Sequence, residues 1–129
     1  MNIQSLIQKI ESIQGISKVM MGHPSMLESI ENAPIVWLSS ITESPMPNER
    51  ISGPISQKVL VNIELTVGTR THESMDEIRS RLLDSLLGFQ ADPDDFPMTK
   101  SRGKMEFMDP SWVVWVDYYD TAYYIEQNH

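Results

Sequence analysis

The stretch QKVLVNIELTVGTRTHESMDEIRSRLLDSLLGF, residues 57–89, changes partway along its length from one apolar repeat to another. Over residues 57–70 apolar and polar side chains alternate, which is the repeat of a strand with one buried face. Over residues 73–89 the apolar side chains follow the spacing of an amphipathic helix, which we expect to end at Gly88. A strand that leads straight into a helix is typical of domains in which helices pack on a sheet. The side chains expected on the buried face of the strand are Val59, Val61, Ile63, Leu65 and Val67.

The start of this helix is also marked in the sequence. Ser74 and Glu77 have the Ser-x-x-Glu spacing of a capping box, in which each side chain binds a free backbone N–H group. Glu77 also lies one turn before Arg81, a spacing at which opposite charges pair. We therefore expect Ser74 to be the N-cap and Glu77 to bind Arg81.

The remaining segments predict a second long helix, a short helix and further strands. Residues 2–14 carry an apolar stripe at helical spacing, and residues 23–32 predict a short helix with Pro24 in its first turn. Further strands are predicted over residues 16–21, 35–39, 104–108 and 112–127, the last two joined by a turn at Asp109 and Pro110. Long connections without a repeat fill residues 40–56 and 90–103.

This order predicts one α+β domain over residues 1–129. We expect a single two-layer unit, with a mixed or mainly antiparallel sheet of about four to five strands and two main helices packed on one of its faces. A chain of 129 residues has the usual size for one such domain.

Composition excludes several classes of function. The chain has 18 acidic and 10 basic residues, a net charge of −8, which disfavours tight binding to nucleic acids or to anionic membranes. It has no cysteine, which excludes disulfides and thiolate zinc sites. No apolar run approaches the roughly 20 residues that cross a bilayer, so we expect a soluble protein made in the cytoplasm.

The sequence predicts no catalytic, cofactor-binding or metal-binding residue. Nucleophile elbows, phosphate-binding glycine loops and zinc-binding helices are missing, and His23, His72 and His129 lie far apart in the chain. The acidic residues of ADPDDF, residues 91–96, fit a solvated turn better than a cation site. Asp117 and Asp120 interrupt the last strand, and we expect Asp117 on its wet face.

The last strand carries aromatic rings on both faces. Alternation places Trp112, Val114, Val116 and Tyr118 on one face and Trp115, Asp117 and Tyr119 on the other. Rings on both faces do not all fit one small core, so some form a subunit interface or are exposed without a role. The nine methionines also have two possible explanations, which are packing in the core and a subunit interface. The candidate interface residues are Trp115, Tyr119 and Tyr123 from this strand and Glu43, Arg50, Asp94 and Asp95 from the two long connections. For Trp115 and Tyr119 we expect substitution by alanine to weaken assembly more than folding.

Taken together, the segments GISKV, APIVWL, VLVNIELTVGTR, MDEIRSRLLDSLLGF and WVVWVDYYDTAYYIEQ occur in an order and spacing that resembles the tail terminator (tail completion) proteins of long-tailed bacteriophages. The likeness covers most of the chain, although no single motif is diagnostic. The resemblance implies a small α+β domain that assembles into a hexameric ring, with neither enzymatic activity nor cofactor. It also implies a place on the head-proximal end of the tail tube, in the tail or neck of the virion.

The partners implied by the resemblance are further copies of the chain, the tail tube protein and a head-tail connector or head-closure protein. DNA passes through the lumen of such a ring without specific binding, and the negative charge of this chain suits that passage. Two alternatives stay open: another head-tail joining or baseplate adaptor protein, and a small ligand-binding or enzymatic α+β domain that uses its aromatic strand as a pocket wall.

Overall fold

The computed structural model describes residues 1–16, 18–22, 34–47, 56–108 and 110–126. Within these ranges the elements in chain order are α1 (Ile3–Glu11), β1 (Val19–Met21), β2 (Ile35–Pro45), β3 (Ser56–Thr69), α2 (His72–Leu86), β4 (Thr99–Met108) and β5 (Val113–Glu126). The short helix predicted over residues 23–32 lies outside the described residues.

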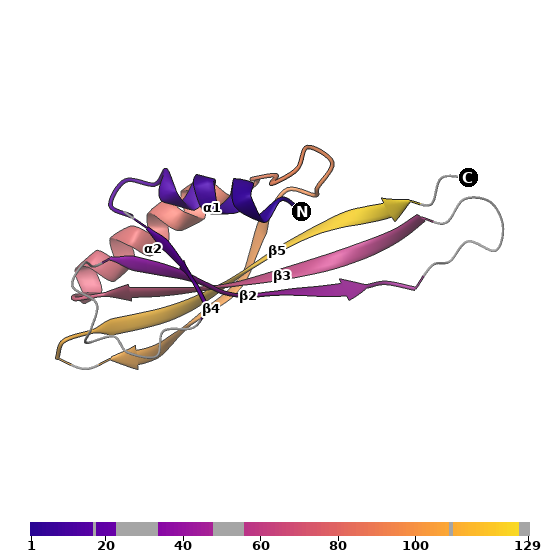
Figure 1. Ribbon diagram of the computed structural model, residues 1–129. Helices are drawn as coiled ribbons and strands as arrows, with labels where there is room; N and C mark the ends of the chain where they lie inside the picture. Colours follow the sequence, from indigo (N-terminus) through magenta and orange to yellow (C-terminus); the bar gives the residue numbers. More distant parts are fainter. Residues whose placement is uncertain (17, 23–33, 48–55, 109, 127–129) are drawn as a thin grey trace.

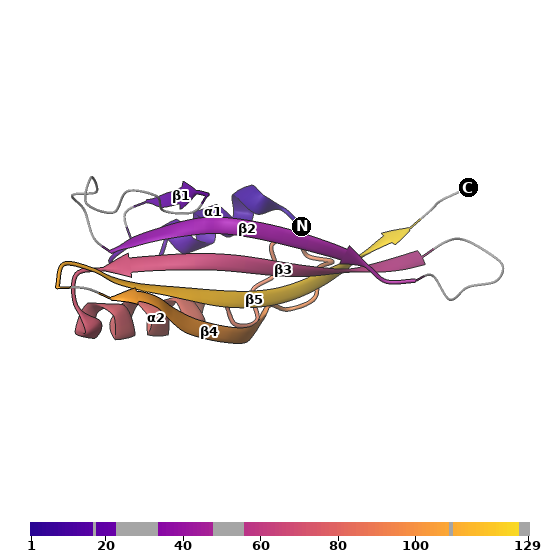
Figure 2. The same cartoon turned by 90° about the horizontal axis from the view of Figure 1, so that it is seen from below.

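The strands form one mixed sheet in the order β1-β2-β3-β5-β4. β1 runs parallel to β2, whereas β2, β3, β5 and β4 pair antiparallel with their neighbours. Both helices lie on the same side of the sheet (Figure 1). The view in Figure 2 shows β1 and β2 at one edge and β4 at the other. The predicted two-layer α+β architecture is therefore confirmed.

The core lies between the helices and the face of the sheet that they cover. The predicted alternation in β3 is confirmed, because Val59, Val61, Ile63, Leu65 and Val67 are all buried. Their partners in β5 share this face: Ile63 lies opposite Tyr119, and Leu65 lies opposite Asp117. The apolar side chains that the helices contribute to this core are Leu6 and Ile10 of α1 and Met75, Ile78, Leu82 and Leu86 of α2.

The helix α2 begins earlier than its capping-box spacing suggests. Thr71 is the N-cap: its backbone is extended, and its hydroxyl oxygen accepts a hydrogen bond of 3.1 Å from the backbone N–H of Ser74. The prediction that Ser74 caps the helix is wrong, because Ser74 already lies in the first turn. Glu77 instead binds Arg81 one turn later, as predicted.

Both long connections are shorter than the sequence suggests. β2 continues to Pro45, with a register shift between Leu38 and Ser40, so the connection predicted from residue 40 is wrong in its first part. β4 begins at Thr99, inside the second predicted connection. These parts of both strands are largely exposed, so they lack the apolar alternation that marks a strand with a buried face.

Three strands extend past the helical layer. The ends of β2, β3 and β5 project away from α1 and α2 as a narrow arm, visible on the right of Figure 1. We define the arm as residues 43–47, 56–60 and 122–126. Because no helix covers the arm, some of its apolar side chains are exposed.

Candidate assembly surfaces

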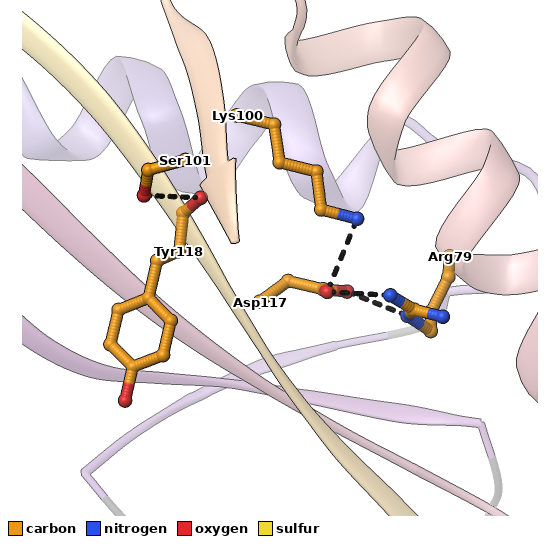
Figure 3. Close-up of polar contacts among 5 residues, drawn as sticks. All are labelled: Arg79, Lys100, Ser101, Asp117 and Tyr118. Carbon is orange, nitrogen blue, oxygen red and sulfur yellow. Dashed lines mark hydrogen bonds and ion pairs between the residues drawn. The ribbon is translucent and has the colours of Figure 1, made fainter. Parts of the chain in front are cut away.

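A buried cluster of charges joins α2 to the sheet (Figure 3). The carboxylate of Asp117 on β5 is completely buried and accepts hydrogen bonds from Nε and Nη2 of Arg79 on α2, at 3.0 and 2.9 Å. Nζ of Lys100 on β4 lies 3.3 Å from the same carboxylate. The expectation that Asp117 lies on the wet face is wrong, because it shares the helix-covered face of β5 with Tyr119. Two cations supply the charge that permits this burial.

The surroundings of this cluster fit closely around it. The guanidinium group of Arg79 stacks on the ring of Trp115, with 3.8 Å between its central carbon and the ring centroid. Gly103 of β4 lies opposite Asp117, where an added Cβ atom would collide with the carboxylate and lie 2.8 Å from Nη2 of Arg79. The cluster therefore fixes α2, β4 and β5 relative to one another, and we assign it a structural role.

Tyr119 belongs to the core of the chain. Its side chain is completely buried, and its hydroxyl group has no hydrogen-bond partner among the described residues. Burial raises the pKa of Tyr119 well above its usual range, and the nearby charge of Asp117 raises it further. Since the ring is not accessible at the surface of one chain, Tyr119 is removed from the candidate interface.

The other candidate interface residues lie in different surroundings. Trp115 and Tyr123 are half-buried at the margin of the core, whereas Glu43 and Asp94 are exposed. Asp95 is buried, and its carboxylate accepts a hydrogen bond of 3.1 Å from the backbone N–H of Asp92, so it stabilises its own loop. Arg50 lies outside the described residues.

The structure brings part of this set together at the base of the arm. Tyr123, Asp94 and Asp95 line a hollow of about 640 Å³, together with Met1, Asp92, Pro93, Tyr124 and Glu126. Burial raises the pKa of Tyr123, and a hydrogen bond from its hydroxyl to Glu43 raises it further. Four predicted positions from three segments thus meet near one surface, while Trp115 lies beside Arg79 at the charged cluster.

Exposed apolar side chains lie on the arm and on β4, and others, such as Met21 and Leu87, lie outside both groups. On the arm, Tyr124 and Ile125 are about half exposed at 51% and 49% on opposite faces of β5, and Leu60 is exposed on the same face as Tyr124. Met46 is exposed as well. On β4, the exposed apolar side chains are Met105, Phe107 and Met108. For Met105 and Met108 the sequence left core packing and an interface open, and the structure places both of them exposed on β4.

Polar side chains connect three strands on the sheet face opposite the helices. The hydroxyl of Tyr118 on β5 donates a hydrogen bond of 2.7 Å to Glu64 on β3, and this bond is the main cause of the raised pKa of Tyr118. Arg102 on β4 lies over the same ring, 4.4 Å from its centroid. Asn62 donates a hydrogen bond of 2.8 Å to Asp120. This face therefore carries a connected set of charges that reaches the β4 edge.

Groupings of histidine and carboxylate side chains suited to a metal ion do not occur within the described parts of the chain. The described helices are also too short or too polar to cross a membrane. Neither a protein-family model nor a curated protein sequence matches this chain.

Proposed function

We propose that this chain is a structural protein of a long-tailed bacteriophage, which forms a ring, expected to be hexameric, on the head-proximal end of the tail tube. The ring ends tube growth, offers a joint to the head connector and leaves a central channel for DNA. The proposal rests on the resemblance of the sequence to tail terminator proteins, together with the shape and surface of the fold.

The arm is the structural observation that supports the proposal most. The strands that extend past the helical layer expose apolar side chains on both faces of the arm, with Leu60 and Tyr124 on one face and Ile125 on the other. Exposed apolar side chains of this kind suit a contact with another protein. In the proposed ring the arm of one copy meets a different surface on the next copy, which makes the contact heterologous. Heterologous contacts close into rings when the rotation between copies permits it.

The charge of the chain suits a channel for DNA. With a net charge of −8, a ring of several copies repels phosphate groups at short range, so DNA slides through without adhering. The same charge argues against a protein that holds DNA tightly.

Light scattering after size-exclusion chromatography tests the proposal. Six copies of the 14.8 kDa chain are expected as a species of roughly 90 kDa, either with the protein alone or after incubation with purified tail tubes. Binding to the tube end distinguishes a tail terminator from another head-tail joining or baseplate protein. A chain that stays monomeric both alone and with tubes contradicts the proposal.

A further inference from the structure

The two edges of the sheet differ in chemistry. At one edge, β4 is exposed along most of its length and carries Lys100, Arg102 and Lys104 within five residues. At the other edge, β2 has no Lys or Arg between Ile35 and Pro45, and its exposed residues are Ser40, Thr42, Glu43, Ser44 and Pro45. β4 therefore carries three cations and one anion, Glu106, whereas this part of β2 carries one anion and no cation.

The outer edge of β2 is only partly covered. β1 pairs with Val36, Trp37 and Leu38, and the backbone N–H of Gly22 donates to the carbonyl of Leu38. Beyond that point, none of the described strands pairs with the outer edge of β2. Residues 40–45 lie beyond this pairing and can meet another strand, although Pro45 has no backbone N–H to donate.

The strand directions favour a copy in the same orientation. β2 is antiparallel to β3, β3 to β5 and β5 to β4, so β2 and β4 run in opposite directions. A second copy placed beside the first without inversion brings its β2 antiparallel to the first copy's β4. Two antiparallel strands can share a ladder of backbone hydrogen bonds.

The charges disfavour some symmetric pairings of β4. Registers that place Arg102 or Lys104 opposite the same residue of another copy bring like charges together, which destabilises a strand pair, whereas a register that places Glu106 opposite Lys104 does not. The register shifts in β4, between Lys100 and Arg102 and between Met105 and Phe107, also protect it from indiscriminate pairing. β2 has no cation between Ile35 and Pro45, so it avoids this repulsion, while Glu43 lies on the helix-side face, away from Arg102 and Lys104.

We propose that β4 of one copy pairs with residues 40–45 at the outer edge of β2 in the next copy, so that the sheet continues from protomer to protomer. This contact deepens the proposed ring function and rests on it. Through β5 and β3, β4 lies level with residues 35–42 of β2, so pairing to residues 40–45 displaces successive copies along the strands. Such a displacement accompanies the closure of sheets into barrels and rings.

Cysteine cross-linking tests this contact directly, because the chain has no cysteine of its own. The variants Arg102→Cys and Lys104→Cys mark β4, and Thr42→Cys and Ser44→Cys mark β2. All four positions are exposed, and they lie on the face away from the helices. Each β4 variant is mixed with each β2 variant under mild oxidation, and covalent dimers are measured on non-reducing gels.

Three controls define the contact. Glu43→Cys lies on the opposite face of β2, so it is mismatched to Lys104→Cys. Asp84 is exposed on α2 and belongs to neither strand, so Asp84→Cys reports non-specific cross-linking. Each variant alone reports symmetric contacts. We expect at least one matched mixture to give about ten-fold more dimer than these controls, because a disulfide needs Cβ atoms about 4 Å apart.

The outcomes separate the contact from the ring itself. Rings or oligomers without a cross-link in any matched mixture overturn the β4–β2 contact and leave the proposed function intact. Dimers from a β4 variant alone overturn it too, because they show the symmetric contact. A chain that stays monomeric alone and with tail tubes overturns both proposals.

Discussion

Among single residues, Asp117 has the most demanding position, because its carboxylate is completely buried between α2 and β5. Arg79 and Lys100 neutralise it, and both keep about one-fifth of their side-chain surface exposed. Asp117→Asn removes the charge and leaves the two cations beside an amide. We expect the free energy of unfolding to fall by about 2–4 kcal/mol, measured by urea denaturation.

Asp84→Asn on the exposed side of α2 is the matched control for this substitution. It removes one negative charge without a buried partner, and we expect a change within about 0.5 kcal/mol. Equal stability of the two variants would contradict the structural role of the cluster.

The buried hydroxyl of Tyr119 makes the stability of the fold depend on pH in the alkaline range. Burial raises its pKa in the folded state, so above the ordinary tyrosine pKa of about 10 the unfolded chain loses its proton first. The preference of the folded state for the protonated Tyr119 hydroxyl therefore leaves the free energy of unfolding unchanged below a pH of about 10 and lowers it as the pH rises above that value. Tyr119→Phe removes this titrating group. We therefore expect the free energy of unfolding of the variant to fall less steeply than that of the unmodified chain between a pH of about 10 and 12.

At neutral pH the same substitution removes a buried hydroxyl that has no partner in the described structure. We expect Tyr119→Phe to leave the free energy of unfolding unchanged or to raise it by up to about 1 kcal/mol. Tyr118 and Tyr123, whose pKa values are also raised, leave a residual slope at high pH. A loss of stability at pH 7 would show that the hydroxyl is bound in the folded state.

These two residues mark where alternation alone stops being informative. The period of two places Asp117 and Tyr119 on the same face of β5, and the structure confirms that pairing. Which of the two faces is covered depends on where the helices pack. The carboxylate of Asp117 suggested that its face was exposed to solvent, whereas this is the face that the helices cover. The burial becomes favourable through cations that are distant in sequence, Arg79, 38 residues away, and Lys100.

Among the secondary-structure elements, α2 offers a test of its own boundary. Thr71 caps the helix, while Ser74 only donates its backbone N–H to that cap. We expect Thr71→Ala to reduce the free energy of unfolding by about 1 kcal/mol and Ser74→Ala by less than about 0.5 kcal/mol. The reverse order, measured by urea denaturation, would restore Ser74 as the N-cap.

The arm gives a prediction at the same scale. Ile125 is about half exposed near the end of β5, so an aspartate there meets solvent in the isolated chain. We expect Ile125→Asp to change the free energy of unfolding by less than about 1 kcal/mol. We also expect it to raise the protein concentration required for assembly at least about ten-fold. Assembly at the concentration of the unmodified chain would remove the arm from the contact surface.

Elements with a buried face were predicted best. β3 and both long helices were recognised because each covers the core along one stripe of apolar side chains. The second half of β2 and the first half of β4 were assigned to connections, since exposed strands at the edge of a sheet carry polar residues on both faces. The hydrogen bonds that make them strands come from neighbours distant in sequence.

For the molecule as a whole, the fold combines a compact end and a projecting end. The helices lie over one end of the sheet, and the arm leads away from them (Figure 1). This polarity provides two different surfaces to neighbouring copies, which a ring built from heterologous contacts requires. The candidate interface residues of β5 lie toward both ends of the molecule, because this strand runs through its entire length.

Electron microscopy of the purified chain, alone and with tail tubes, tests the central claim most directly. We predict closed rings with a central hole, each of about six copies, free in solution or seated on one end of the tubes. Fields that contain only single 14.8 kDa particles, with tube ends left bare, would contradict it.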